Sequence, residues 1–256
     1  MHLIYSTVGY DYNYLRCIDI FLKTFVMFND VSNFHFLLIC DEQMITTARD
    51  IIKKYNIKSD ILKMNNSNKP YIASMHKIHI FDYPEIMNYT NIIYVDLDCI
   101  FTRSLNDIVN QTLDDNKIYA YKEQDNVEKH RHLFWSLNNY TNEDIEFFKK
   151  NNMYPFNCGC FLFKANDNMK KHFNNIINLV SEHKGEFFYE QSFMNYYFNK
   201  NLLSDYSIIN DSNYFMNFKD IVPSNNPIII HFCGNPGDGF SKITRMTKFR
   251  NLMNIV

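Results

Sequence analysis

Short apolar runs that alternate with longer segments of helical periodicity constrain the fold of this chain more than any other feature. The apolar runs are typical of buried strands and lie at residues 2–8, 34–40, 60–64, 91–98, 117–123, 156–165 and 227–232. Helix-like segments with one apolar face lie between or after them, at about residues 12–28, 42–54, 71–82, 167–183 and 189–199, with a terminal helix after the last strand. Parallel strands need long crossover connections, usually helices. The alternation therefore predicts an α/β fold with a single Rossmann-like, mostly parallel sheet flanked by helices.

The chain length predicts one domain over residues 1–256. Asp41 directly follows the strand at 34–40, and we expect it to be the N-cap of the next helix. Residues 123–155 form a long polar segment that contains Trp135, the only tryptophan. Two interpretations of this segment stay open, a mobile flap or acceptor site and an ordinary surface insertion.

Charge and apolar run length exclude several classes of protein. The net charge of −2 gives no global field for nucleic acid, and no apolar run approaches the roughly 20 residues that span a membrane. The first residues look like a core strand rather than a signal peptide. The six cysteines show no paired spacing for a metal and mostly lie in apolar runs, at positions 17, 40, 99, 158, 160 and 233. Reduced thiols in the cytoplasm fit this pattern better than disulfides.

Asp96 and Asp98 end the apolar run at 91–98. Residues i and i+2 of a strand point to the same side, so both carboxylates can face the cleft beyond the strand. Two negative charges held this close need a counter-charge. A divalent cation supplies it, and carboxylate oxygens suit Mg²⁺ or Mn²⁺, which also accept phosphate oxygens. The alternative is an Asp pair that caps a surface loop.

His231 lies near the end of the last predicted strand, directly before a glycine-rich loop at 234–239. An imidazole added to the two carboxylates shifts the expected metal toward Mn²⁺. Glycines such as Gly234 let backbone N–H groups approach a diphosphate closely. The alternatives are a core histidine and a plain turn.

Two further polar groups follow later apolar segments. Asn157 precedes a glycine inside the strand 156–165, where a bulge or the close approach of a ligand is expected, and its amide could hydrogen-bond a sugar hydroxyl. Gln191 and Asn195 share one helix face at i, i+4, which by itself indicates a solvated face.

Four motifs in order give these residues a family context. They are YVDLDCIF (94–101), FNCGCFLF (156–163), YEQSFMNYYF (189–198) and IIIHFCG (228–234). The order resembles that of glycosyltransferase family 8, the family of glycogenin and the bacterial lipopolysaccharide galactosyltransferases, whose pattern is a strand with DxD, then FNxG, DQxxLN and HFxG. The similarity extends from IYSTVGYDYNYL (4–15) to HFCG.

The resemblance implies a GT-A fold, Mn²⁺ or Mg²⁺, a UDP-sugar donor and retention of anomeric configuration. It assigns metal binding to Asp96, Asp98 and His231, and sugar-side or catalytic roles to Asn157, Glu190 and Gln191. Residues 1–122 would form a nucleotide-binding half and residues 123–256 a sugar and acceptor half. The donor contacts that it implies are Ser6, Thr7, Tyr14, Lys77 in SMHKIHIF (74–81), Asp96, Gly234 and Lys242.

The chain departs from the family pattern at two places. Glu190 stands where the family usually has Asp, and Gly237 replaces the lysine of the family's HFxGxxKPW ending. We expect Lys242 or Arg245 to replace that phosphate contact. The acceptor, whether a glycan, a protein or a small molecule, is not indicated, and the oligomeric state is open, a homodimer included.

Two other functions were weighed against glycosyl transfer. VDLDCIF resembles the DxDxT strand of haloacid-dehalogenase-type phosphatases, but Ile100 replaces the threonine and the motif lies far from the N-terminus. The second alternative is a non-catalytic nucleotide-sugar-binding protein on the same fold. The complete set of two aspartates and a histidine argues against that alternative.

Overall fold

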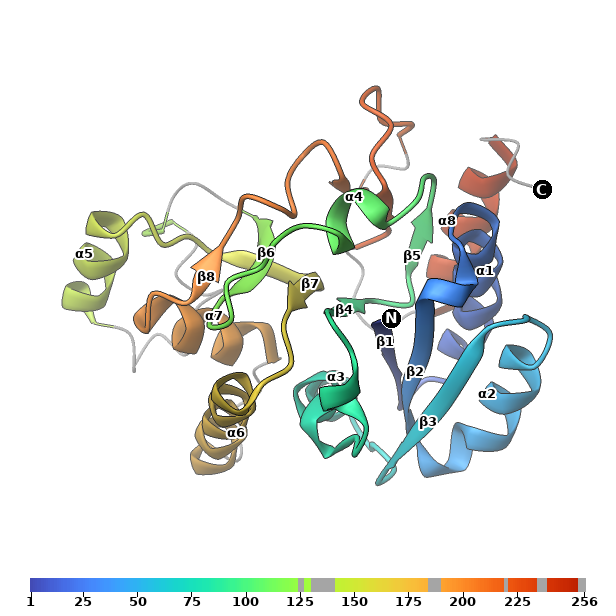
Figure 1. Cartoon of the computed structure of the whole chain (residues 1–256), viewed down its shortest axis with the longest axis horizontal. Helices are drawn as coiled ribbons and strands as arrows, with labels where there is room; N and C mark the ends of the chain where they lie inside the picture. The colour runs from blue at the N-terminus through green and yellow to red at the C-terminus, as the bar shows by residue number, and fades with distance from the viewer. Residues whose placement is uncertain (124–126, 130–140, 184–189, 219–220, 234–238, 253–256) are drawn as a thin grey trace.

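A seven-stranded sheet forms the centre of the molecule, and its order is β3-β2-β1-β4-β7-β6-β8 (Figure 1). The computed structural model describes residues 1–123, 127–129, 141–183, 190–218, 221–233 and 239–252. The strands of this sheet are β1 (His2–Val8), β2 (Phe34–Asp41), β3 (Lys58–Met64), β4 (Ile92–Val95), β6 (Ile118–Lys122), β7 (Phe156–Phe163) and β8 (Ser204–Asp205). Strands β1 to β4 are parallel, whereas β7 is antiparallel to both of its neighbours. The predicted α/β class with a mostly parallel sheet is confirmed.

Three short strands form a second, small sheet in the order β5-β10-β9. They are β5 (Cys99–Phe101), β9 (Tyr214–Met216) and β10 (Ile229–His231). Strand β10 runs antiparallel to β5 and parallel to β9. The apolar run predicted as one strand at 91–98 is thus shorter in the large sheet, and the chain turns after Val95 to enter the small sheet.

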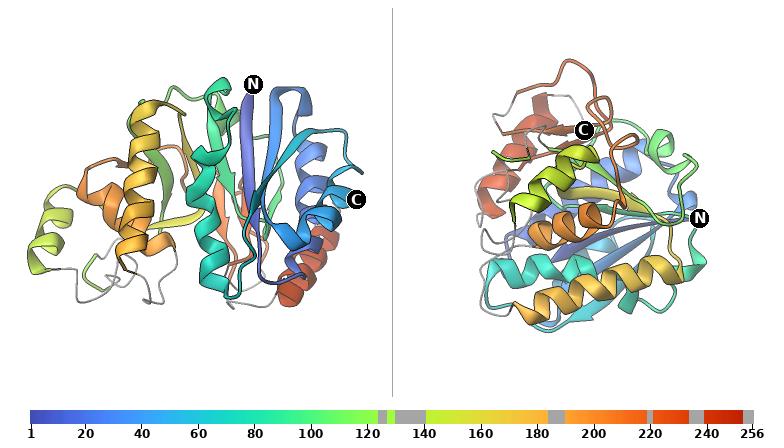
Figure 2. Two further views of the ribbon diagram at one scale, coloured as in Figure 1. Left: turned by 90° about the horizontal axis from the view of Figure 1, so that it is seen from below. Right: turned by 90° about the vertical axis from the view of Figure 1, so that its left-hand side faces the viewer.

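Helices cover both faces of the large sheet (Figure 2). One face carries α1 (Tyr14–Phe28), α2 (Ile45–Ile52) and α8 (Gly239–Leu252), and α1 packs directly against α8. The other carries the 3₁₀ segment η3 (Met75–Asp82), α6 (Asp167–Glu182) and α7 (Glu190–Lys200), with α6 against η3. Shorter helices are α3 (Pro70–Ser74), α4 (Asn106–Val109), α5 (Asn142–Lys150), η1 (Val31–Asn33), η2 (Glu42–Met44) and η4 (Ile86–Asn88).

Alternation along the central strands explains the two helix layers. On β1, Ile4 and Val8 belong to the apolar cluster under α1 and α8, whereas Leu3 and Tyr5 belong to the cluster under η3 and α6. Successive side chains of a strand point to opposite faces, so a strand that is apolar throughout must be covered on both sides.

No helix among the described residues is long and apolar enough to cross a bilayer.

One local prediction needs correction. Asp41 makes no side-chain cap of the helix that follows; its carboxylate instead accepts hydrogen bonds from Tyr10 and Ser67 and contacts His76. The buried carboxylate of Asp41 therefore stabilises the neighbouring loops through hydrogen bonds and does not cap a helix N-terminus. The polar segment 123–155 contains α5, which begins with a capping box of Thr141 and Asp144. Trp135 lies outside the described residues.

Candidate active site

A tight turn after β4 presents the two aspartates at the carboxyl end of the parallel strands. The Asp96 N–H donates to the Gly159 carbonyl of β7 at 2.8 Å, and the Cys99 N–H closes the turn onto the Asp96 carbonyl at 3.2 Å. The Phe232 N–H donates to the Asp98 carbonyl at 2.9 Å. The turn is therefore fastened to both sheets, at the edge where ligands of parallel α/β sheets bind.

His231 comes from the small sheet and meets both carboxylates. Its Nε2 lies 3.1 Å from Asp98 Oδ1 and 3.7 Å from Asp96 Oδ2. Neighbouring ligands of an octahedral Mg²⁺-type site with bonds of about 2.1 Å are about 3 Å apart. The structure thus brings His231 Nε2 within 4 Å of both predicted carboxylate ligands, and its separation from Asp98 Oδ1 is close to the one that a single ion needs.

A chain of hydrogen bonds orients the imidazole of His231. Asn157 Oδ1 accepts from the Gly159 N–H at 2.8 Å and from the Tyr214 hydroxyl at 2.9 Å, so the Tyr214 proton is committed to Asn157. His231 Nδ1, which is hydrogen-bonded to the same hydroxyl, must therefore donate to it. In the neutral ring Nε2 then presents its lone pair to two carboxylates. Three electron-rich atoms that face one another fit a bound cation, and an oriented second nitrogen is typical of metal-ligating histidines.

Gly159 makes room for this imidazole. A Cβ at this position would lie 2.7 Å from His231 Nδ1 and 2.8 Å from Asn157 Oδ1. The glycine inside the strand thus permits the close approach of a side chain from the same protein rather than of a ligand. The expected irregularity is present, because the pairing of β6 with β7 jumps from Ala120–Phe161 to Tyr121–Asn157.

Lys242 on α8 balances one carboxylate oxygen. Its Nζ lies 2.7 Å from Asp98 Oδ2 and also donates to the Phe232 carbonyl, and the lysine is buried. Burial by itself raises the pKa of Asp98, but His231 and Lys242 outweigh it and hold the pKa of this carboxyl well below its usual value. Asp98 is thus a carboxylate whose Oδ1 faces the site while Oδ2 is neutralised by Lys242.

Lys77 on η3 links Asp96 to Glu190. Its Nζ lies 2.6 Å from Glu190 Oε1 and 3.3 Å from Asp96 Oδ1, and it donates to the Cys158 carbonyl at 3.2 Å. Burial works against its charge, but the two carboxylates raise the pKa of Lys77 well above its usual value. The Glu190 Oε2 atom is buried and has no hydrogen-bond partner within the described part of the chain.

Helix α7 joins the site through side chains that bond to the backbone of β7. Gln191 Oε1 accepts from the Cys158 N–H at 3.2 Å, and its Nε2 donates to Glu123 Oε2 at 3.0 Å. Asn195 accepts from the Phe156 N–H and donates to the Phe156 carbonyl, and it is fully buried. The interpretation of a solvated face is therefore wrong for Asn195. Its side-chain amide makes the hydrogen bonds to the Phe156 backbone that a neighbouring strand would otherwise make.

The predicted nucleotide contacts lie around the ends of β1 and the start of α1. Ser6 is buried and its hydroxyl donates to the Val95 carbonyl, and Thr7 Oγ1 lies 3.1 Å from the Tyr94 hydroxyl. Burial, followed by Asp98, raises the pKa of Tyr14, so its phenol lies within electrostatic reach of the site. Arg245 donates to the Cys233 carbonyl at 3.1 Å, and Gly234 and the rest of the loop 234–238 lie outside the described residues.

Two residues of the site were not predicted from the sequence. Tyr214 orients His231, and the Tyr94 hydroxyl donates to Asp96 Oδ1. Tyr94 stands at i−2 of Asp96 in the same apolar run, a position from which it could have been inferred. Tyr214 carries no comparable local signal because its contact depends on pairing between β9 and β10.

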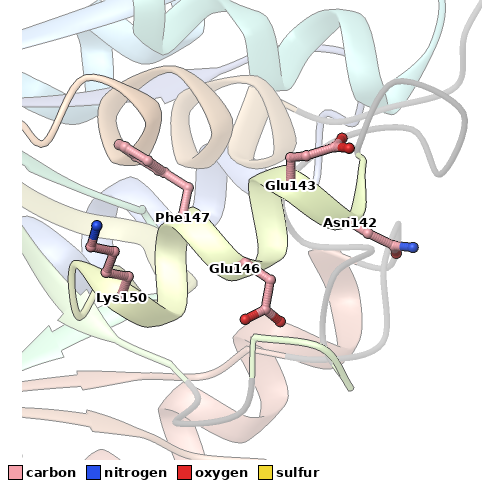
Figure 3. Close-up of a pocket in the computed structure, with 5 residues that line it drawn as sticks. All are labelled: Asn142, Glu143, Glu146, Phe147 and Lys150. Carbon is pink, nitrogen blue, oxygen red and sulfur yellow. The ribbon is translucent and has the colours of Figure 1, made fainter.

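A hollow of about 450 Å³ on the surface of α5 contains none of the predicted site residues (Figure 3). It is lined by one face of this helix, with residues Asn142, Glu143, Glu146, Phe147 and Lys150. Helix α5 and α8, which carries Lys242, lie at opposite ends of the molecule in Figure 1. The hollow is therefore separate from the cluster of carboxylates and imidazole.

Solved structures with the same fold are glycosyltransferases of the GT-A type. The bifunctional glycosyltransferase WbbM has a TM-score of 0.68 at 13% identity, over 100% of this chain and 51% of that chain. The galactosyltransferase LgtC, solved with donor and acceptor sugar analogues, has a TM-score of 0.61 at 15% identity, over 98% of this chain and 96% of that chain. GlyE of Streptococcus pneumoniae TIGR4 has a TM-score of 0.57 at 16% identity, over 98% of this chain and 63% of that chain. The chain thus spans about half the length of WbbM, and these likenesses show the fold.

Comparison by sequence gives the family. No curated protein sequence matches the chain significantly. The profile of glycosyl transferase family 8 matches residues 6–236, which include most of the residues described above. The chain is therefore a glycosyltransferase that belongs to glycosyl transferase family 8.

Proposed function

We propose that this glycosyltransferase is metal-dependent and retaining, and that it transfers a sugar from a UDP-sugar to a hydroxyl acceptor. The observation that carries the proposal is the convergence of Asp96 Oδ2, Asp98 Oδ1 and His231 Nε2 at the carboxyl end of the sheet. These three atoms would hold Mn²⁺ or Mg²⁺, which when bound supplies a Lewis acid for the leaving diphosphate. Membership of the family removes the phosphatase and the purely sugar-binding alternatives.

Lysines beside the carboxylates would add fixed positive charge near the leaving group. Lys77 is held by Asp96 and Glu190, and Lys242 is held by Asp98. Charge that is already oriented stabilises developing negative charge without reorganisation. We assign Lys77 to the donor side. Lys242 is buried against Asp98, and we assign to it the support of that aspartate. Lys242 would contact a phosphate directly only if it moved on donor binding.

The sugar would lie between β7 and α7. Glu190 Oε2 is a buried acceptor without a partner among the described residues, and a donor-sugar hydroxyl would satisfy it. Hydrogen bonds to Cys158 and Glu123 fix the orientation of the Gln191 side chain. Its amide is a poor nucleophile. Asn157 is committed to Tyr214 and Gly159, so we now propose that it orients His231 through Tyr214.

Because an amide such as that of Gln191 is a poor nucleophile, we propose front-face transfer. The acceptor oxygen bonds to the anomeric carbon while the bond from that carbon to the diphosphate oxygen breaks. The acceptor proton passes to the leaving diphosphate oxygen, so atoms and charge balance. Ser6, Thr7 and Tyr14 would support the nucleotide, with residues 1–122 as its half of the domain and residues 123–256 as the sugar and acceptor half.

The test is a screen of UDP- and GDP-sugars for nucleotide release, with and without Mn²⁺, in the absence of an added acceptor. We expect release from at least one UDP-sugar, only when Mn²⁺ is present. Release that is equally fast in a chelator would overturn the metal dependence, and release from GDP-sugars alone would overturn the choice of nucleotide.

The six buried, unpaired cysteines agree with a reducing compartment, and on this ground we propose the cytoplasm.

A further inference from the structure

Cys99 places a thiol beside the imidazole and one of the carboxylates of the candidate site. The ligand atoms of Asp98, Cys99 and His231 all lie within 4.8 Å of one another, and all three residues are buried. Cys99 is the direct antiparallel partner of His231, in the pairing of β5 with β10. Side chains of directly opposed residues lie on the same face of a sheet, so the backbone itself sets the thiol next to the imidazole.

This set of atoms differs in chemistry from the set that suits Mn²⁺ or Mg²⁺. Hard cations prefer carboxylate oxygens, whereas a thiolate with an imidazole and a carboxylate is typical of Zn²⁺ and of ions with similar preferences. A tetrahedral site with bonds of about 2.0–2.3 Å needs ligands roughly 3.5 Å apart. His231 Nε2 and Asp98 Oδ1 are 3.1 Å apart, and the thiol lies within 4.8 Å of a ligand atom of each residue, so a small movement of the thiol would close the site.

We propose that Asp98, Cys99 and His231 form a second coordination mode of this site, which binds thiophilic divalent cations such as Zn²⁺ or Co²⁺ and competes with Mn²⁺. On binding, the Cys99 thiol loses its proton to solvent and a sulfur–metal bond forms. The fourth position would be filled by water or by Asp96 Oδ2, which lies 3.7 Å from His231 Nε2. Competition with Mn²⁺ rests on the proposed function, but binding of the soft ion does not.

Burial keeps the thiol of Cys99 away from solvent, because the residue is fully buried. A bound metal ion is the largest local charge in such a site and deprotonates a coordinating thiol. The thiol is therefore placed to ligate a cation that already binds Asp98 and His231.

Cobalt is the probe, because a cobalt–thiolate bond produces a charge-transfer absorption band in the near ultraviolet. The purified wild-type protein, free of donor, is titrated with Co²⁺ alongside C99A, C99S and the control C40A. Cys40 is also a buried strand cysteine, but it lies on β2, next to Asp41 rather than beside Asp98 and His231. Thermal unfolding of each variant shows that the fold is retained.

We expect a band that saturates at one Co²⁺ per chain in the wild type and in C40A, and that is absent from C99A and C99S. Excess Zn²⁺ should abolish it. Absence of the band in the wild type, or its persistence in folded C99A, overturns the proposal. The readout needs no catalysis, so failure of the cobalt experiment leaves the glycosyl-transfer proposal standing, and inactivity in the donor screen leaves the cobalt result standing.

The functional consequence is measured separately as inhibition. With Mn²⁺ held constant, the Zn²⁺ concentration that halves nucleotide release should be at least about tenfold higher in C99A than in the wild type, a change that corresponds to about 1.4 kcal/mol of binding free energy. Equal sensitivity of the two proteins would contradict competition through Cys99.

Discussion

At the scale of single residues, the imidazole of His231 is positioned by groups from two other strands. Tyr214 on β9 holds its Nδ1, Asn157 on β7 holds Tyr214, and Gly159 on β7 leaves the space that the ring occupies. Second-layer partners of this kind are typically worth 10–100-fold in metal affinity. The orientation of His231 is therefore as much a property of these neighbours as of His231 itself.

Replacement of Gly159 by alanine tests the space beside the imidazole. The new Cβ must displace the His231 ring or Asn157, since it would lie 2.7 Å from Nδ1 and 2.8 Å from Asn157 Oδ1. We expect a loss of roughly 1–3 kcal/mol in stability from overpacking and of at least about tenfold in Mn²⁺ affinity, measured by denaturant unfolding and by Mn²⁺ titration without donor. The control is G9A, which crowds Asp41 instead and should reduce stability while leaving Mn²⁺ affinity near that of the wild type. Unchanged Mn²⁺ affinity in G159A would show that the ring position does not matter.

Replacement of Lys242 by methionine tests the charge balance at Asp98. The variant removes the lysine that pairs with the buried Asp98 carboxylate, and removal of one partner of a buried pair costs about 3–5 kcal/mol. Because the folded pKa of Asp98 is lowered, its contribution to stability is full above the unfolded pKa of about 3.9 and is lost as pH falls through the folded value.

Loss of Lys242 raises the folded pKa of Asp98, so this contribution shrinks at every pH above the unfolded value. Unfolding midpoints between pH 3 and 7 should therefore lie below those of the wild type, with the largest difference toward neutral pH and convergence in acid. The matched control is K248M, at an exposed position of the same helix. A K242M curve that overlays the wild type across this range would mean that Lys242 does not stabilise the Asp98 carboxylate.

At the scale of secondary-structure elements, Asp41 connects the segments that surround the proposed nucleotide site. From the end of β2 it accepts from the Tyr10 N–H at 2.8 Å and the Ser67 N–H at 3.0 Å, and it contacts His76 Nε2 at 2.6 Å. Tyr10 has a positive φ of 65°, a conformation that needs such support. His76 directly precedes Lys77, so one carboxylate holds both the loop after β1 and the segment that carries Lys77.

Replacement of Asp41 by alanine should leave several buried donors without their acceptor. We expect a loss of about 3 kcal/mol or more in unfolding free energy, together with weaker binding of UDP in the presence of Mn²⁺, measured by denaturant unfolding and calorimetry. D41N, which keeps one acceptor oxygen, should lose less. The control is D107N, an exposed aspartate of α4. If D41A binds UDP as tightly as the wild type, the carboxylate does not organise this end of the site.

Strands β1, β2 and β7 of the large sheet could be predicted from their apolar runs because each is long and mostly buried. The run at 34–40 is apolar at every position, as a strand covered on both faces must be. Strands β5, β9 and β8 could not be predicted, because they have two or three residues and exist only through pairing with distant segments. The predicted N-cap at Asp41 is wrong for the same reason. A cap is inferred from a local pattern, whereas Ser67 and His76, the partners of Asp41, are far along the chain.

At the scale of the whole molecule, the site is assembled from segments that are widely separated in the sequence. Lys77 comes from η3, Asp98 from the turn after β4, Glu190 from α7, His231 from β10 and Lys242 from α8. The identity of most of these residues could be predicted from motifs, but their ion pairs could not, since each pair joins two elements. The match of the family profile over residues 6–236 agrees with a site that uses most of the chain.

The central claim is that Asp96, Asp98 and His231 hold one divalent cation that serves glycosyl transfer. The most direct measurement is the Mn²⁺ concentration dependence of nucleotide release from the UDP-sugar substrate by the wild type, D98N and H231Q, with D107N as the matched control. We predict that D107N follows the wild-type curve, and that D98N and H231Q lose at least about a hundredfold in rate or require at least about tenfold more Mn²⁺. Wild-type rates and an unshifted Mn²⁺ dependence in both site variants would contradict the account.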